Sequence, residues 1–300
     1  MSAPQISWLP DGRRLHMNHG PIDLIVEAFG DAAEVRAAYG QAAARFETIL
    51  AELVAELPML RSAAGTTPRL FRARPAQRME DVASRLVADA HGYGKSLFLT
   101  PMAAVAGAVA DEMLAAMVSG RGLEKAYVND GGDIAIHLSP DAEMKAAIAG
   151  TAHGLEDRLT VRFADPVRGM ATSGWRGRSF SLGIADAVTV LARTAAEADA
   201  AATVIANAVD LPNHPATARL PACELAPDSD LGERLVTTAV GDLSREERAA
   251  ALDAGLATAD ELRRSGLIDA AALFLGDDAR VSGMPAESLV SPADMRSVAA

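Results

Sequence analysis

Residues 171–210 read ATSGWRGRSFSLGIADAVTVLARTAAEADAAATVIANAVD, and this stretch decides the fold class. The run at 186–192 is mostly apolar after Asp186 and rich in β-branched side chains, which predicts a buried strand. Thr194 is followed three residues later by Glu197, the spacing of a capping box, and this predicts a helix that runs to Val209. A buried strand that leads into a capped helix indicates a domain of mixed α and β structure.

Asp199 and Thr203 lie four residues apart in the predicted helix, so both side chains fall on one helix face. A carboxylate and a hydroxyl arranged in this way can offer oxygen to Mg²⁺, which takes few protein ligands beside substrate phosphates. In the alternative interpretation, Asp199 only complements the positive end of the helix, and Thr203 packs or bonds a carbonyl of its own helix. The spacing leaves both interpretations open.

Two strands are predicted on either side of the turn Asn129-Asp130-Gly131-Gly132, at 125–128 and 133–138. Asn, Asp and Gly tolerate a positive φ, so a plain hairpin turn explains this motif. Upstream, Thr100-Pro101 opens a predicted helix that is rich in Ala and Gly. Such small side chains admit either a neighbouring helix or a ligand close to the backbone.

Other elements complete the pattern. Strands at 14–17 and 22–28 are predicted to form a hairpin. Near the C-terminus, Ser244-x-x-Glu247 and Thr258-x-x-Glu261 both have the capping-box pattern and predict two short helices. The first hairpin is followed by a long amphipathic helix, whose apolar stripe predicts core packing and comprises Val35, Tyr39, Ala42, Phe46, Ile49, Leu53 and Leu57.

Four segments occur in an order that resembles the ApbE family: 128–134 (VNDGGDI), 171–174 (ATSG), 187–190 (AVTV) and 198–203, which holds Asp199 and Thr203. Residues 101–111 and 228–232 are similar to a shorter, functionally uncharacterised branch of that family. The family consists of FAD:protein FMN transferases, which cleave the FAD pyrophosphate with Mg²⁺ and attach FMN to a threonine or serine of a partner. The resemblance implies an α+β, T-fold-like domain of mixed sheet and helix with a smaller C-terminal lobe.

The resemblance also implies a site. Asp199 and Thr203 match the family's magnesium ligands and are the implied catalytic residues, with a backbone carbonyl between residues 105 and 107 as a third ligand. Gly131 and Gly132 match a glycine pair that contacts the flavin. Asp111 matches the aspartate that closes a Lys-Gly-x-x-x-Asp pattern. The implied nucleotide-binding set is completed by Ala106, Gly107, Asn129, Thr172, Ser173, Gly174 and Arg178.

The chain departs from the transferases in two places. Ala106 stands at the lysine of that pattern, and a His-Ile-Ile-Asp-Pro-Arg-Thr-Gly type segment is missing before the Val-Thr-Val strand. A cation and a covering loop neutralise phosphate charge and exclude water, on which phosphoryl transfer depends. Arg176 and Arg178 are the candidates to supply the missing charge.

Three hypotheses follow from the motifs and the departures. The first is a Mg²⁺-assisted FAD transferase or pyrophosphatase. The second is a non-catalytic protein that binds a flavin, a pterin or another nucleotide-like ligand. The third is a homodimeric interaction protein with a vestigial pocket.

Composition narrows the classes of partner. The 300 residues carry a formal net charge of −12, and half of them are hydrophobic, so a large aliphatic core is expected. This acidity argues against nucleic acid and anionic membranes as partners, since both bind protein surfaces that carry a local excess of positive charge. The expected partners are a small nucleotide or flavin and an acceptor protein. Mg²⁺ is the expected metal, and FAD or FMN is the expected substrate or ligand.

The same reasoning gives expectations for the compartment and the domains. Cys223 is the only cysteine, so no disulfide forms within the chain. No apolar signal segment occurs near the N-terminus and Asp111 interrupts the apolar helix, so we expect a cytoplasmic protein that does not cross a membrane. Pro212 to Pro215 marks a boundary. We expect an ApbE-like core at 1–211, a smaller lobe at 212–283 and a flexible tail at 284–300.

Overall fold

The computed structural model describes residues 3–147 and 158–283, and its contacts divide the chain into two compact units. The predicted division into a core at 1–211 and a smaller lobe at 212–283 stays a prediction, and the predicted tail at 284–300 lies outside the described residues. Unit 1 comprises Met1–Met144, Arg162–Ala171 and Ala192–Ala200, and unit 2 comprises Lys145–Val161, Thr172–Leu191 and Ala201–Ala300.

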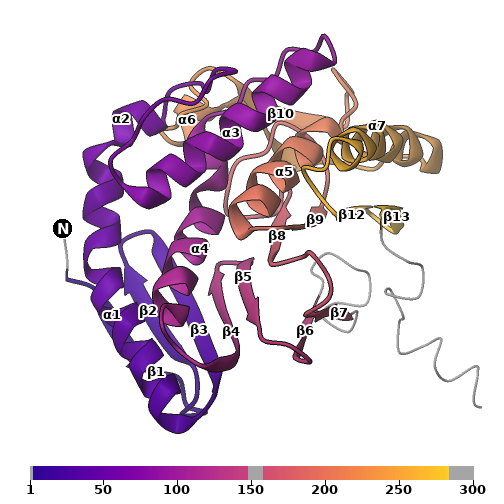
Figure 1. Cartoon of the computed structure of the whole chain (residues 1–300). Coiled ribbons are helices and arrows are strands. Elements are labelled where there is room, and N and C mark those ends of the chain that lie inside the picture. The colour runs from indigo at the N-terminus through magenta and orange to yellow at the C-terminus, as the bar shows by residue number, and fades with distance from the viewer. Residues whose placement is uncertain (1–2, 148–157, 284–300) are drawn as a thin grey trace, which may run out of the picture. The chain divides into compact units, whose positions relative to one another are not determined.

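Unit 1 is built on antiparallel strands that follow one another in the sheet (Figure 1). Burial alternates along β3, so Leu24, Val26 and Ala28 all enter the core from one face. The predicted N-terminal hairpin is confirmed as β2 and β3, and the predicted glycine turn is confirmed between β4 and β5. In sheet order the strands are β1 (Gln5–Trp8), β2 (Leu15–His19), β3 (Ile22–Gly30), β4 (Leu123–Asp130), β5 (Asp133–Leu138) and the start of β8 (Gly169–Ser173).

Helices cover the sheet of unit 1. α1 packs against β3, α4 packs against β4 and β5, and α3 packs against α4. The predicted stripe of α1 is confirmed as core at Tyr39, Ala42 and Phe46, which are all buried. These helices are α1 (Ala32–Ala55), α2 (Leu57–Leu60), α3 (Arg74–Gly92), the 3₁₀ turn η1 (Pro101–Ala104) and α4 (Val105–Val118).

The segment Pro101–Val118 is, within the described residues, long and apolar enough to cross a membrane by length and composition alone. Inside unit 1, however, it lies against two strands and two helices, and more than half of it is buried. Both of its acidic residues have partners there: Asp111 binds backbone amides and Glu112 binds Arg45. This is the environment of a core helix in a globular domain.

The helix that follows the buried strand is α5 (Ala195–Ala208), as predicted. Only half of the predicted capping box forms. Thr194 Oγ1 accepts a hydrogen bond from the Glu197 amide at 3.2 Å, whereas the Glu197 carboxylate is paired with an arginine of α3 at 2.6 Å. The amides of the first two helical residues are bound by a carboxylate of α4, so a distant residue completes the cap.

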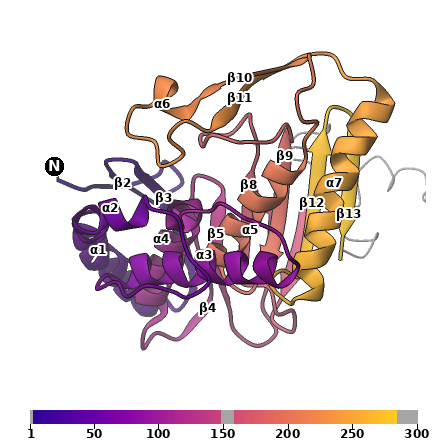
Figure 2. The same ribbon diagram turned by 90° about the horizontal axis from the view of Figure 1, so that it is seen from above.

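Unit 2 contains a second set of antiparallel strands. β9 (Ala187–Ala192) is buried along its whole length, as its apolar run predicts, and pairs with β12 (Ala270–Leu275). α7 (Arg245–Arg264) packs against β12 and its neighbour (Figure 2). The other elements are β13 (Asp278–Ser282) beside β12, the pair β10 (Thr217–Pro221) and β11 (Leu235–Val240), the short α6 (Ala222–Leu225), and the pair β6 (Glu143–Ala147) and β7 (Arg158–Arg162).

One of the two C-terminal capping boxes is confirmed and the other is wrong. Ser244 Oγ accepts from the Glu247 amide at 3.2 Å, and the Glu247 carboxylate accepts from the Ser244 amide at 2.7 Å. Thr258 instead lies inside α7, where its hydroxyl donates to the Ala254 carbonyl at 3.4 Å. The helix continues through it because one apolar face stays buried on both sides, at Leu252, Ala259 and Leu262.

Candidate functional site

The start of α4 meets α5 within unit 1 at a glycine. The amide of Gly107 donates to Asp199 Oδ2 at 3.0 Å. A Cβ on Gly107 would lie 2.3 Å from the carbonyl oxygen of Ala195, so only glycine allows the two backbones to approach this closely. Two segments that are 92 residues apart in sequence therefore place the predicted metal ligand against the first turn of α4.

Asp199 stands in a concentration of negative charge. Burial raises the pKa of its carboxyl group well above the usual range, and the charges of Asp133 and Asp130 raise it further against the opposing effect of the Gly107 amide. Its side chain is nevertheless partly accessible. Among the described residues, no three His, Cys, Asp or Glu side chains are placed to hold a metal ion. The other two aspartates thus act on Asp199 through their charge.

Asp111 serves the helix that carries Asp199. Its two carboxylate oxygens accept hydrogen bonds from the amides of Ala195 and Ala196, at 3.1 and 3.0 Å. Burial raises the pKa of Asp111, and these two amides oppose that rise. The carboxylate lies at the positive end of α5, where a negative charge is favoured. Asp111 therefore positions α5, and its predicted direct contact with a nucleotide stays a prediction.

The glycine pair of the motif forms a braced turn with an open face. Asn129 Oδ1 accepts a hydrogen bond from the Gly132 amide at 2.8 Å. Gly131 and Gly132 have φ values of +64° and +122°, which residues other than glycine rarely adopt. Apart from its two neighbours in the chain, no described residue has an atom within 4 Å of the position of a Cβ on Gly132. The turn explains the hairpin, and its open face leaves room for a flat ligand.

Two further predicted site residues lie in helices α4 and α5, which fix their positions. Ala106 lies in the first turn of α4, where its methyl group brings no cation beside Asp199. Thr203 lies one turn after Asp199 in α5, and its side chain is partly accessible. The helical period puts Asp199 and Thr203 on the same face, as the sequence predicts.

The Thr-Ser-Gly segment lies at the end of β8 in unit 2. The hydroxyl groups of Thr172 and Thr189 are 2.8 Å apart, which joins β8 to β9. Ser173 is partly accessible. A Cβ on Gly174 would lie 2.4 Å from the carbonyl oxygen of Asp186, so glycine is required for a close backbone approach. These contacts make the segment a tight structural turn, and its predicted contact with a nucleotide stays a prediction.

The two candidate cations differ in their surroundings. Arg176 already has partners within the protein, because its Nε donates to Asp186 Oδ1 at 2.5 Å and its guanidinium lies over the Trp175 ring. Arg178 is exposed and makes no hydrogen bond or ion pair with the described residues. Asp186 also accepts from the Trp175 indole and from the Gly276 amide, at 3.1 and 2.7 Å. Of the pair, Arg178 is therefore the one whose charge is available.

Sequence reasoning missed three carboxylates. Asp130 and Asp133 act on Asp199, and Asp186 accepts hydrogen bonds from three residues of unit 2. For the first two, the signal was present in the motif, which carries an acidic residue on each side of the glycine pair. For Asp186 the sequence carried no such signal, because its three donors lie 10, 11 and 90 residues away.

The fold belongs to a known class. It is similar to a solved structure described as the flavinyl transferase ApbE of Pseudomonas stutzeri in its apo form, with a TM-score of 0.52. The likeness covers 97% of this chain and 99% of that one, at 13% identity. The protein thus has an ApbE-like α+β fold, which confirms the predicted fold class.

The family described as AbpE bacteria matches residues 6–281, and this chain belongs to it. Membership confirms the predicted ApbE-like resemblance. The chain is also similar to a UPF0280 protein of Methanothrix thermoacetophila, with 41% identity over 119 residues that cover 39% of this chain and 49% of the relative. For a UPF0280 protein of Methanococcoides burtonii the identity is 36% over 132 residues, 44% of this chain and 53% of the relative. The chain spans about half the length of the curated relatives it matches.

Proposed function

We propose that this protein is a Mg²⁺-assisted flavin-nucleotide transferase or pyrophosphatase that acts on FAD. The observation that carries the proposal is the carboxylate of Asp199, fixed by the Gly107 amide among the charges of Asp130 and Asp133. Family membership and the ApbE-like fold support a function related to flavin transfer.

The residues present fit a magnesium ion. A carboxylate and a hydroxyl, from Asp199 and Thr203, are hard oxygen ligands of the kind that Mg²⁺ prefers. The nearby charges of Asp130 and Asp133 disfavour the ionised form of the Asp199 carboxyl group when no cation is present. A divalent cation would compensate these negative charges. When bound, the ion neutralises charge on the pyrophosphate.

The other residues then have defined tasks. Asp111 holds the N-terminus of α5, and the Gly107 amide orients Asp199. The open face of Gly132 receives the flat flavin ring. Arg178, whose guanidinium is uncommitted among the described residues, supplies positive charge for the phosphates in place of the missing lysine.

The proposed reaction breaks the P–O bond between the two phosphates of FAD. With water as the nucleophile, the products are FMN and AMP. With a serine or threonine hydroxyl of an acceptor protein, the FMN phosphate forms an ester with that side chain and AMP leaves. We place the protein in the cytoplasm, so the proposed acceptor is found there.

A second candidate is a protein that binds a flavin, a pterin or another nucleotide-like ligand without turnover. Two observations favour it. Ala106 brings no cation to the first turn of α4. Both oxygens of Asp111 are occupied by backbone amides of α5. A site that places few positive charges around the phosphates can still bind a nucleotide, but it stabilises the transition state of phosphoryl transfer poorly.

The experiment incubates the purified full chain with FAD and Mg²⁺, with and without EDTA. Chromatography measures FMN and AMP, and fluorescence measures bound flavin. We expect equimolar FMN and AMP that disappear with EDTA. Tight flavin binding without products would replace the first candidate with the second, and neither products nor binding would contradict both.

A matched pair of variants locates the reaction. Asp199→Asn keeps an acceptor for the Gly107 amide and removes the charge, so Mg²⁺-dependent product formation is expected to fall at least about 100-fold, roughly the loss of one strong electrostatic contact. Asp141→Asn changes an exposed aspartate in the same unit and is expected to leave the rate unchanged. Full activity of Asp199→Asn would show that the metal assignment is wrong.

A further inference from the structure

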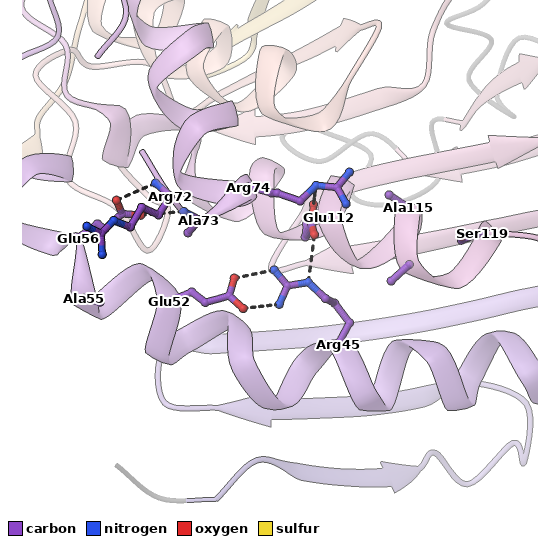
Figure 3. Close-up of a pocket in the computed structure, with 11 residues that line it drawn as sticks. Arg45, Glu52, Ala55, Glu56, Arg72, Ala73, Arg74, Glu112, Ala115 and Ser119 are labelled. Atoms are coloured by element: carbon purple, nitrogen blue, oxygen red, sulfur yellow. Dashed lines mark hydrogen bonds and ion pairs between the residues drawn. The ribbon is translucent and has the colours of Figure 1, made fainter. Parts of the chain in front are cut away.

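A pocket of about 900 Å³ opens between α1, α3 and α4 in unit 1 (Figure 3). Its wall has three arginines, Arg45, Arg72 and Arg74, and three glutamates, Glu52, Glu56 and Glu112. None of the residues assigned above to magnesium, flavin or phosphate lines it.

Several of the charged groups are already satisfied. The Arg45 guanidinium binds both oxygens of Glu52, at 2.9 and 2.7 Å, and its Nε donates to Glu112 Oε1 at 3.0 Å. Glu56 accepts hydrogen bonds from the backbone amides of Arg72 and Ala73, both at 2.9 Å. These bonds make a fixed wall, so Arg45, Glu52 and Glu56 have little left to offer a ligand.

One buried acceptor is left open. The Glu112 side chain is only 4% exposed, and its Oε2 accepts no hydrogen bond from the described residues. Arg78 Nη2 and Arg74 Nε compensate its charge from 3.6 and 3.9 Å, beyond hydrogen-bond length. Buried polar atoms normally have a partner, so this oxygen calls for a donor from outside the chain.

The opposite side of the pocket offers an open cation. Figure 3 shows Arg72 beside Glu56, on the far side of the Arg45–Glu52 pair from Glu112. The Arg72 side chain is exposed and makes no hydrogen bond or ion pair with the described residues. Of the three arginines in the wall, Arg45 pairs with Glu52 and Arg74 faces Glu112, so Arg72 is the one whose charge is available to a ligand with negative charge.

We propose that this pocket binds a small phosphate ester that also carries hydroxyl groups. The phosphate contacts Arg72, and a hydroxyl donates to Glu112 Oε2. A neutral donor suits Glu112 better than an ammonium, because Arg45, Arg74 and Arg78 already surround it with positive charge. The proposal is independent of FAD and of the Asp199 site.

Titration calorimetry of the full chain with ribose 5-phosphate tests the proposal, since this probe carries both groups. Ribose has only the hydroxyls and inorganic phosphate has only the anion. We expect saturable binding of ribose 5-phosphate at least tenfold tighter than that of either half. No saturable binding, or equal affinity for inorganic phosphate or ribose, would overturn the proposal.

Variants separate this pocket from the proposed flavin site. Arg72→Ala changes an exposed side chain and is expected to weaken binding roughly tenfold or more, as loss of a charged hydrogen bond does. Arg61→Ala, an exposed arginine of the same unit that does not line the pocket, is the control and should leave affinity unchanged, as should Asp199→Asn. An unaltered affinity in Arg72→Ala, or a loss in Asp199→Asn, would contradict the assignment.

Glu112→Gln tests the other end of the pocket and is expected to weaken ribose 5-phosphate binding to a similar extent. Because Glu112 accepts a hydrogen bond from Arg45 Nε, circular dichroism must first show that this variant is folded. Should it fail to fold, the comparison of the three probes and the Arg72→Ala result decide the proposal without it.

Discussion

The Gly107 amide lies 3.0 Å from Asp199 Oδ2, and this hydrogen bond ties the first turn of α4 to the start of α5. The contact requires a residue without a Cβ at position 107, since the Ala195 carbonyl fills that space. It also requires that α5 keep its place, which the carboxylate of Asp111 secures. Helix packing and the candidate site thus depend on the same junction.

Gly107→Ala is expected to destabilise the protein. The added methyl group would lie 2.3 Å from the Ala195 carbonyl oxygen, so the two helices must separate, at a cost of about 1–3 kcal/mol in the free energy of unfolding. Urea denaturation measures it. Gly40→Ala in α1 is the control: apart from the backbone of α1 itself, no described residue comes within 4 Å of its Cβ position, and the change should add roughly 0.5–1 kcal/mol of stability. Equal stability of the two variants would contradict the close approach.

Asp199→Asn is expected to separate stability from metal binding. In EDTA the variant should melt at the same temperature as the wild type or about 2 °C higher, because a charge among Asp130 and Asp133 is removed. Mg²⁺ should raise the melting temperature of the wild type only, since a ligand stabilises the state that binds it. Differential scanning calorimetry with and without Mg²⁺ distinguishes these outcomes, and an equal Mg²⁺ response in both proteins would remove Asp199 from the metal site.

The ion pair of Glu80 and Arg69 predicts a pH dependence of stability. Burial tends to raise the pKa of Glu80, but hydrogen bonds from the Arg69 side chain and amide outweigh it and lower the pKa below 4.5. A lowered folded-state pKa contributes stability that is present above pH 4.5 and is lost as the pH falls through the folded-state value.

Glu80→Gln should therefore cost roughly 3 kcal/mol at pH 7, because it breaks a buried pair, and the difference from the wild type should shrink as the pH falls below 4.5. Urea unfolding at several pH values measures this. Glu47→Gln, an exposed residue of α1, serves as the control and should show no such difference. A Glu80→Gln deficit that stays constant with pH would show that the pair does not titrate as its contacts indicate.

The two capping-box sequences near the C-terminus are expected to respond differently to alanine. Ser244→Ala removes the hydroxyl that accepts from the Glu247 amide and should cost about 1 kcal/mol. Thr258→Ala lies inside α7 and should be neutral or slightly stabilising, because alanine favours a helix interior. Chemical denaturation of both variants checks the assignment. A larger loss for Thr258→Ala would mean that the helix breaks there after all.

The sequence determined the elements whose causes are local. The buried strand before Thr194, the braced turn at Gly131-Gly132 and the stripe of α1 follow from hydrophobic period and turn chemistry, which act over a few residues. The order of motifs also determined the ApbE-like fold, confirmed by the family match. Local pattern failed at Thr258, where the capping residues are present but burial of one helix face carries the helix on.

Only the tertiary structure decided what the polar side chains do. Asp111 binds amides 84 and 85 residues away, Asp199 meets Gly107 across 92, and Glu112 faces α1 with an oxygen left open. Helical spacing gives the face on which a side chain lies but not the neighbour it meets there. That neighbour is set by the packing of segments distant in sequence, and packing also sets the burial and the surrounding charge from which a carboxylate takes its chemistry.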